Sequence, residues 1–246
     1  MQRFEGSVAL ITGASRGIGL AVARRLVSEG ASVVITGRDE EALKEAVASL
    51  GEDRALGVAG KADDAEHRAA AISRAAERFG GIDHLVNNAG INPVWGPLSD
   101  MDLDAARKIF EVNVIAALEW TKAAAAAGRL RSVLNMASIA GTSASPNIAF
   151  YGISKAALVN LTMQLADELA PAVRVNALAP AVVKTRLSKA LYEGREDKVI
   201  RAYPMARLGE PDDVAGPAAF LLSEDAAWVT GQTLLVDGGA SIRQAG

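Results

Sequence analysis

Short apolar runs alternate with longer amphipathic stretches along almost the whole chain. The short runs are rich in Val, Ile and Leu and end at Gly, Asn or Asp, which is typical of strands buried on both faces of a parallel sheet. Between them, apolar residues recur at helical spacing, as in 17–29, where Arg24 and Arg25 turn outward. The expected strands cover 7–12, 32–36, 55–59, 84–87, 132–136, 173–178 and 233–236.

The alternation of strand and helix predicts how these elements assemble. A helical segment follows Asp63 and ends near Phe79, and longer ones lie near 102–127 and 149–169. Right-handed crossovers between parallel strands then give an α/β, Rossmann-type doubly wound sheet of about seven strands with helices on both faces. We expect 1–246 to form one dinucleotide-binding and catalytic domain. Its ligand should lie at the carboxyl ends of the strands.

Composition and charge exclude several functions. The chain has 246 residues, half of them hydrophobic, and can bury a sizeable core. The net charge of −3 argues against nucleic-acid binding, which needs a basic excess. The absence of cysteine excludes disulfides, thiolate catalysis and metal–thiolate sites, and we expect no metal. No run is long enough for a membrane span or a signal peptide, so we expect a cytoplasmic protein that does not bind membranes.

A glycine-rich motif, TGASRGIG (12–19), follows the first expected strand and opens the first helix. Gly13 permits a tight turn, while Gly17 and Gly19 allow close approach of backbone and helix. A pyrophosphate could then lie at the helix N-terminus among free N–H groups. An ordinary glycine-rich turn is the alternative, which the position between strand and helix disfavours.

The second strand indicates which dinucleotide would bind. An acidic residue at its end takes the ribose hydroxyls of NAD, whereas an arginine accommodates the 2′-phosphate of NADP. Here the strand ends Thr36-Gly37-Arg38, and Arg16 lies in the glycine loop. Both arginines can meet one phosphate, which favours NADP(H) over NAD. Two solvated arginines are the alternative.

Three polar positions follow the middle strands or interrupt a helix. NNAG (87–90) ends the fourth strand, where Asn side chains can hold backbone and Ala-Gly lets a cofactor pass. Asn113 lies inside an expected helix, which asparagine disfavours. Ser138 lies just past the fifth strand. Each of these is, taken alone, equally consistent with a loop, a cap or a local hydrogen bond.

Tyr151 and Lys155 are four residues apart and therefore share one helix face. A free tyrosine has a pKa of about 10, too high for easy proton transfer at neutral pH. A nearby cation can lower such a pKa by about 1–3 units. Lys155 would thus tune Tyr151, and the Ser138 hydroxyl would orient a substrate oxygen. Alternatively, the tyrosine packs and the lysine points to water.

Taken together, these residues resemble the short-chain dehydrogenase/reductase family over nearly the whole chain. The resemblance rests on Thr12-Gly13-x-x-x-Gly17-x-Gly19, Asn87-Asn88-Ala89-Gly90, Asn113, Ser138 and Tyr151-x-x-x-Lys155, in order, and on VTGQTLLVDGG (229–239). It implies that Tyr151 exchanges the substrate proton and that Lys155 lowers its pKa and holds the nicotinamide ribose. Ser138 would position the carbonyl, and Asn113 would hold a water that relays protons.

The same resemblance implies a set of cofactor-binding residues, with two departures. Ala181 stands where the family usually has glycine after proline, and Lys61 stands where it commonly has an aspartate facing the adenine. Asp63 could reach the adenine region or start the next helix. The expected cofactor contacts are Gly13, Ser15, Arg16, Gly17, Ile18, Gly19, Arg38, Asp63, Asn88, Ala89, Gly90, Tyr151, Lys155, Pro180 and Thr185.

Substrate and partners follow less directly. Within the family the chain is most similar to NADP-linked carbonyl and retinal reductases, which implies a small carbonyl or alcohol substrate and a homotetramer packed through 102–127 and 149–169. The substrate wall would come from 91–97, with Trp95, and from 182–205. Reduction of 3-oxoacyl groups on an acyl carrier protein is the alternative, with Arg129 and Arg131 as a basic patch. A non-catalytic dinucleotide sensor is a third. The expected wall residues of 182–205 are Leu187, Leu191, Tyr192 and Tyr203.

Overall fold

A seven-stranded parallel sheet forms the centre of the molecule. The computed structural model describes residues 2–242, and within them the strands take the order β3-β2-β1-β4-β5-β6-β7. The order reverses between β1 and β4, and their carboxyl ends lie where a doubly wound sheet binds its ligand. The strands are β1 (Val8–Ile11), β2 (Ser32–Gly37), β3 (Ala55–Ala59), β4 (His84–Asn87), β5 (Ser132–Met136), β6 (Arg174–Pro180) and β7 (Thr233–Val236).

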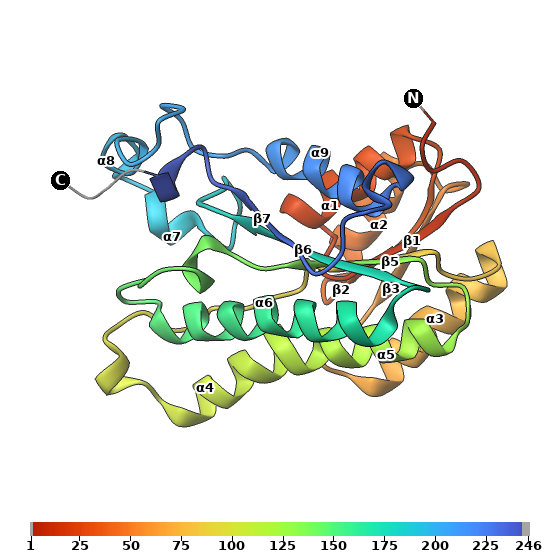
Figure 1. Cartoon of the computed structure of the whole chain (residues 1–246), viewed down its shortest axis with the longest axis horizontal. Helices are drawn as coiled ribbons and strands as arrows, with labels where there is room; N and C mark the ends of the chain where they lie inside the picture. The colour runs from red at the N-terminus through yellow and green to blue at the C-terminus, as the bar shows by residue number, and fades with distance from the viewer. Residues whose placement is uncertain (1, 243–246) are drawn as a thin grey trace.

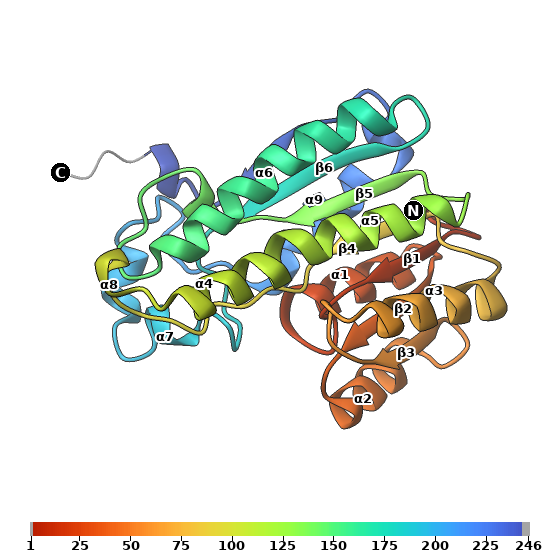
Figure 2. The same ribbon diagram turned by 90° about the horizontal axis from the view of Figure 1, so that it is seen from below.

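Helices cover both faces of this sheet (Figures 1 and 2). One face carries α1, α2 and α9, and the other carries α3, α4, α5 and α6, while the short α7 and α8 lie together at one end. This arrangement confirms the predicted Rossmann-type fold. The helices are α1 (Gly17–Ser28), α2 (Glu40–Leu50), α3 (Ala65–Phe79), α4 (Leu103–Phe110), α5 (Ala116–Ala126), α6 (Ala149–Leu169), α7 (Lys189–Tyr192), α8 (Glu196–Ile200) and α9 (Pro211–Leu222).

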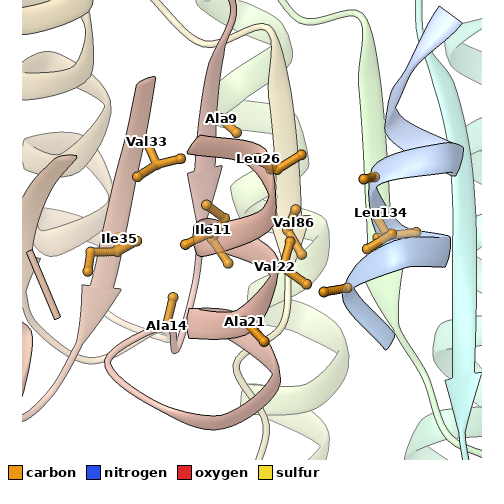
Figure 3. Close-up of a cluster of buried hydrophobic side chains, with 14 of the residues drawn as sticks. Ala9, Ile11, Ala14, Ala21, Val22, Leu26, Val33, Ile35, Val86 and Leu134 are labelled. Carbon is orange, nitrogen blue, oxygen red and sulfur yellow. The ribbon is translucent and has the colours of Figure 1, made fainter. Parts of the chain in front are cut away.

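Burial on both faces explains why the strands are continuous apolar runs. Figure 3 shows one side of the core, where Ile11 and Val33 of the sheet face Val22 and Leu26 of α1. A second cluster fills the opposite face, with Trp120 of α5 as its largest fully buried side chain. Removal of this apolar surface from water is the main driving force for the fold.

The boundaries of one helix and one strand differ from the sequence prediction. The helix after β3 is capped by Asp64, whose carboxylate accepts the backbone N–H groups of Glu66 and His67. The alternative that Asp63 starts this helix is therefore wrong. β6 also continues to Pro180, two residues beyond the predicted end.

The predicted helix near 102–127 runs through α4 and α5 with a π-helical turn between them. This turn spans Glu111–Ile115 and contains Asn113. π-helical turns are rare and frequently occur at functional sites. Among residues 2–242, no helix combines the length and the apolar character needed to cross a membrane.

Candidate functional site

The turn after β1 is built on glycines that no larger residue could replace without strain or clash. Gly13 and Gly17 have φ of 64° and 60°, a region that residues with a side chain rarely adopt. A Cβ added to Gly19 would lie 2.6 Å from Asn88 Nδ2 and 2.8 Å from the Cα of Ala14. The loop thus brings the start of α1 against the chain that follows β4.

The N-terminus of α1 is suited to an anion. Asp39, Asp64 and Asp102 cap α2, α3 and α4 with their carboxylates. By contrast, the N-cap of α1 is Arg16, whose side chain makes no capping hydrogen bond, and the first turn contains no acidic residue. The free N–H groups and the helix dipole favour a phosphate there. The residues present therefore fit the pyrophosphate of a dinucleotide.

The NNAG segment after β4 holds this turn in place. Asn88 Nδ2 donates hydrogen bonds to the carbonyl oxygens of Thr12 and Gly13, both at 2.9 Å. In return, Thr12 Oγ1 accepts the backbone N–H groups of Asn88 and Ala89, each at 3.0 Å. Thr12 was not among the expected site residues, although it precedes the first motif glycine. Two loops far apart in sequence thus form one hydrogen-bonded unit.

The end of β2 lies beside the same turn. A Cβ at Gly37 would come within 3.2 Å of Ser15 Oγ, so Ser15 lies beside the end of β2. Arg16 Nη2 forms an ion pair with Asp39 Oδ2 at 2.9 Å. The neighbouring Arg38 is exposed. Both expected arginines therefore lie around the point where β2 meets α2.

Gly90 lies against the polar residues of the π-helical turn and of α6. A Cβ on Gly90 would be 3.3 Å from Asn113 Oδ1 and 3.4 Å from Lys155 Nζ. Asn113 Oδ1 accepts Ile91 N–H at 2.8 Å, and its Nδ2 donates to Ile91 O and to Ser154 Oγ, both at 3.0 Å. The asparagine that the sequence marked as unusual in a helix thus fixes the chain after NNAG to α6.

Ser138, Tyr151 and Lys155 meet past the end of β5. The Ser138 hydroxyl is hydrogen-bonded to the Tyr151 phenol. Lys155 is buried, and its Nζ lies 5.6 Å from the centroid of the Tyr151 ring. The same ammonium donates to Met136 O at 2.7 Å. The three residues form one cluster, as their spacing predicted.

Burial has the largest effect on the protonation of this cluster. Burial raises the pKa of Tyr151 to about 12, and the hydrogen bond from Ser138 only partly opposes it. Burial also lowers the pKa of Lys155 to about 8. Desolvation penalises the charged forms of both residues, and the lowering of the Tyr151 pKa by Lys155 stays a prediction.

The segment after β6 crosses the glycine turn. Thr185 Cγ2 lies 3.4 Å from the position of a Cβ at Gly17. Pro180 O accepts a long hydrogen bond of 3.5 Å from Ser138 Oγ. Ala181, the departure from the family pattern, donates its N–H to Val236 O of β7. Pro180 thus lies beside the cluster of Ser138, Tyr151 and Lys155, and Thr185 lies beside the glycine turn.

Two remaining expected cofactor residues have other surroundings. Asp63 forms an ion pair with Lys108 of α4, which lowers the pKa of its carboxyl. Ile18 of α1 packs against the apolar core with its partly buried side chain. Lys61 is exposed. The structure thus gives Asp63 a role in linking two segments at the end of β3.

The two segments of the expected substrate wall lie close together. The Arg195 guanidinium lies over the Trp95 ring at 5.8 Å, so the segments 91–97 and 182–205 face each other. Leu187 is exposed, and Leu191 and Tyr192 are partly buried. Tyr203 is buried, and its hydroxyl accepts the N–H of Val182 at 3.3 Å. Tyr203 lines a cavity of about 310 Å³ with Val182, Met205 and Leu235.

Arg129 and Arg131, expected as a basic patch for an acyl carrier protein, both contact a buried carboxylate. Arg129 donates to both carboxylate oxygens of the buried Asp83 at 2.9 Å, and Arg131 Nε lies 3.6 Å from Asp83 Oδ1. Both arginines precede Ser132, the first residue of β5, whereas Ser138 follows the other end of that strand. They hold the amino ends of the strands together, away from the candidate site.

The polar side chains of the site include those of serine, asparagine, tyrosine and lysine. Within the described range 2–242, no group of three or more His, Asp or Glu side chains could hold a metal ion. Sequence reasoning missed Ser154, whose hydroxyl bonds Asn113 and also donates to Tyr151 O at 2.7 Å. No spacing rule marks a serine one residue before a lysine, so this link needed the structure.

Comparisons with known proteins agree with this geometry. A family model described as Enoyl-(Acyl carrier protein) reductase matches residues 13–241. Dehydrogenase/reductase SDR family member 4 of Caenorhabditis elegans is 40% identical, and the match covers 98% of each chain. The human protein of the same name is 41% identical over 96% of this chain and 88% of its own length. A crystal structure titled short-chain dehydrogenase/reductase SDR, glucose/ribitol dehydrogenase, from Brucella melitensis superimposes with a TM-score of 0.93 at 35% identity, covering 99% of both chains.

Proposed function

The chain belongs to the short-chain dehydrogenase/reductase family, and from this premise we propose that it is an NADPH-dependent carbonyl reductase, which can also run as an alcohol dehydrogenase. Members of this family are oxidoreductases that use a nicotinamide dinucleotide. The observation that carries the proposal is the buried cluster of Ser138, Tyr151 and Lys155 beside Gly90. A protein that only senses a dinucleotide has no need of that combination.

Each residue of the cluster has one proposed task. Ser138 donates a hydrogen bond that positions the substrate oxygen next to the Tyr151 phenol. Tyr151 exchanges the proton at that oxygen, and Lys155 provides a positive charge beside the phenol and a donor for the nicotinamide ribose. Asn113 fixes Ile91 and α6 relative to each other, and we keep the proposal that it also serves a proton-relaying water. When bound, the nicotinamide supplies the hydride.

The pKa of Tyr151 favours the reducing direction. With a pKa of about 12, the phenol is protonated at neutral pH. A carbonyl oxygen that accepts a hydride becomes an alkoxide, a much stronger base than a phenolate. The phenol can therefore give up its proton as this negative charge develops, and any lowering of its pKa by the charge of Lys155 would ease the transfer.

NADP(H) is the proposed cofactor, with NAD(H) disfavoured. Support comes from the absence of an acidic residue at the last position of β2, where Gly37 stands, and from Arg16 and Arg38 nearby. The glycine turn, Asn88, Ala89, Gly90, Pro180 and Thr185 would hold the rest of the dinucleotide. We also retain Asp63 as a residue near the adenine, although its carboxylate is paired with Lys108.

We further propose a cytoplasmic homotetramer packed through α4–α5 and α6, with 182–205 as the substrate-binding segment. Several large apolar side chains on these elements are exposed, including Leu103 of α4 and Met163 of α6. Burial of such surface between copies would stabilise an oligomer. Analytical ultracentrifugation of the wild-type protein tests the assembly.

The deciding experiment follows oxidation of NADPH and NADH with aromatic, aliphatic and acyl carbonyls, beside the Tyr151→Phe variant. We expect turnover with NADPH, much less with NADH, and a loss of at least about 100-fold in the variant because its proton donor is gone. Turnover by the variant at the wild-type rate would refute the proposed role of Tyr151. Dinucleotide binding without turnover of any carbonyl would favour a sensor instead.

Reduction of a carrier-bound 3-oxoacyl substrate remains a second candidate, because the matching family model is described as Enoyl-(Acyl carrier protein) reductase, a name that also implies a carrier-bound acyl substrate. Arg129 and Arg131 are engaged with Asp83 and give it little support. The test compares the same 3-oxoacyl group free and attached to the carrier protein. A preference of about tenfold or more for the carrier-bound form in kcat/KM, about 1.4 kcal/mol, would favour this alternative.

A further inference from the structure

Ser154 is a buried residue whose hydroxyl joins α6 to the π-helical turn. It directly precedes Lys155, and 0% of its surface is exposed. Its Oγ donates a hydrogen bond to Tyr151 O at 2.7 Å and accepts one from Asn113 Nδ2 at 3.0 Å. A hydroxyl has one hydrogen to donate and lone pairs that accept, so these two bonds can form together. One side chain therefore connects the backbone of Tyr151 to a neighbouring helical segment.

Asn113 extends this connection to the chain that follows Gly90. Its Oδ1 accepts the N–H of Ile91 at 2.8 Å, and its Nδ2 donates to Ile91 O and to Ser154 Oγ, both at 3.0 Å. The two hydrogens of the amide nitrogen are thus shared between Ile91 and Ser154. Asn113 is itself buried, and an unpaired amide hydrogen is unfavourable at such a place. Loss of the Ser154 hydroxyl would therefore remove one of the partners that orient the Asn113 amide.

The two ends of this series of hydrogen bonds carry the groups that would react in the proposed enzyme. At one end, α6 carries the Tyr151 phenol and the Lys155 ammonium. At the other end, Gly90 precedes Ile91, and a Cβ on Gly90 would lie 3.4 Å from Lys155 Nζ. Gly90 belongs to the segment that we propose to hold the dinucleotide. The bonds that connect Tyr151 O to Ile91 therefore help to set the distance between the proton donor and the cofactor.

We propose that Ser154 is a positioning residue, which fixes Tyr151 and Lys155 relative to the cofactor-binding segment through Asn113. This inference rests on the proposed reductase activity and deepens it. Both hydrogen bonds of the Ser154 hydroxyl go to protein groups, so it acts on the reaction only through the residues that it holds. A displacement of the reacting groups by about 1 Å can lower a rate by about 100-fold. Ser154 should thus affect the rate of the chemical step and not the affinity for either ligand.

The Ser154→Ala variant removes both hydrogen bonds and keeps a residue that favours a helix. We measure single turnovers by stopped flow, with the enzyme and NADPH mixed beforehand and a saturating carbonyl added. The first-order rate constant of NADPH oxidation does not depend on the fraction of molecules that are folded. We expect it to fall about tenfold, while KM for the carbonyl and Kd for NADPH change by less than about twofold.

The Ser132→Ala variant is the matched control. Ser132 is equally buried, and its hydroxyl bonds His84 Nδ1 and Leu222 O, but it lies at the amino end of β5. Its loss can lower the unfolding midpoint, whereas the single-turnover rate constant should stay within about twofold of the wild type. An equal fall of this rate constant in both variants would overturn the specific role of Ser154.

Amide hydrogen exchange, followed by mass spectrometry on the full chain, tests the same connection without any turnover. The Ile91 N–H is bonded to Asn113 Oδ1, so loosening of the Asn113 amide would leave this N–H open to exchange. We expect peptides that contain Ile91 to exchange at least about threefold faster in Ser154→Ala and at the wild-type rate in Ser132→Ala. Unchanged exchange in Ser154→Ala would overturn the connection through Asn113.

The two proposals fail in distinguishable ways. If the wild-type protein oxidises NADPH with no carbonyl, the proposed reductase activity fails, and the exchange of Ile91 still decides whether Ser154 holds this segment. If the wild-type protein is active and Ser154→Ala keeps its single-turnover rate constant, only the positioning role of Ser154 fails.

Discussion

Replacement of Lys155 by methionine should make the protein more stable near neutral pH while abolishing its activity. The Lys155 ammonium is buried, and its one hydrogen bond is to Met136 O. Burial lowers its pKa from 10.5 to about 8. Each pKa unit is equivalent to about 1.4 kcal/mol, so keeping the ammonium charged at about pH 7 costs the folded state about 3 kcal/mol.

The sign of the pH dependence follows from proton binding. Between about pH 8 and 10.5, the unfolded chain still binds a proton at Lys155 while the folded chain has lost it, so the stability of the wild type rises with pH relative to a variant without this group. At about pH 9.5 the remaining cost is about 1 kcal/mol. The Lys155→Met variant loses a hydrogen bond worth about 1–2 kcal/mol, which does not change in this pH range. Its advantage should therefore shrink by about 2 kcal/mol between pH 7 and 9.5.

Urea unfolding of both proteins from about pH 7 to 9.5, without added nucleotide, measures this difference directly. Taking the difference cancels the titration of all groups common to both proteins. Lys122→Met is the matched control, because Lys122 is exposed on α5, and its difference from wild type should stay flat. A flat difference for Lys155→Met as well would refute the argument that burial suppresses the ammonium.

Two further substitutions test other parts of the structure. Gly90→Ala would place a methyl group 3.3 Å from Asn113 Oδ1 and 3.4 Å from Lys155 Nζ. We expect kcat/KM in NADPH oxidation assays to fall about tenfold, while the free energy of unfolding stays within about 1 kcal/mol of the wild type. An unchanged kcat/KM would contradict the close approach. Asp83→Asn replaces a buried carboxylate that accepts hydrogen bonds from Val8 N and from two nitrogens of Arg129. In urea unfolding at neutral pH, the free energy of unfolding of this variant should be about 3 kcal/mol lower than that of the wild type, while the turnover per folded molecule stays the same. A variant as stable as the wild type would show that the contact between Asp83 and Arg129 is dispensable.

Much of the fold could be predicted because strands that are buried on both faces of a sheet need apolar residues at most positions. β1 is fully buried and is an uninterrupted apolar run, and the fully buried β5 is apolar except at Ser132 and Asn135. Boundaries were harder to predict. Asp63 and Asp64 are adjacent and equally good helix caps, and only the contact of Asp63 with Lys108 shows which of them is free to cap α3.

The sequence predicted which residues of the candidate site lie close together, but not which groups their charges contact. The spacing of Tyr151 and Lys155 predicted that they share a helix face, and the structure places them together. Whether a lysine faces a phenol or a carbonyl depends on the rotamers of a long side chain and on its burial, which spacing does not specify. Similarly, Arg129 and Arg131 are visible as charges in the sequence, while their partner Asp83 lies 46 residues before Arg129.

The hydrogen bonds between Thr12, Gly13 and Asn88 have a consequence for protein engineering. The glycine turn and the NNAG segment depend on each other, because each forms hydrogen bonds with backbone groups of the other. A cofactor-binding loop transplanted from a related enzyme into residues 12–19 would therefore need its own partner segment at 87–90. Chimeras should be designed around such paired exchanges rather than around contiguous stretches of sequence.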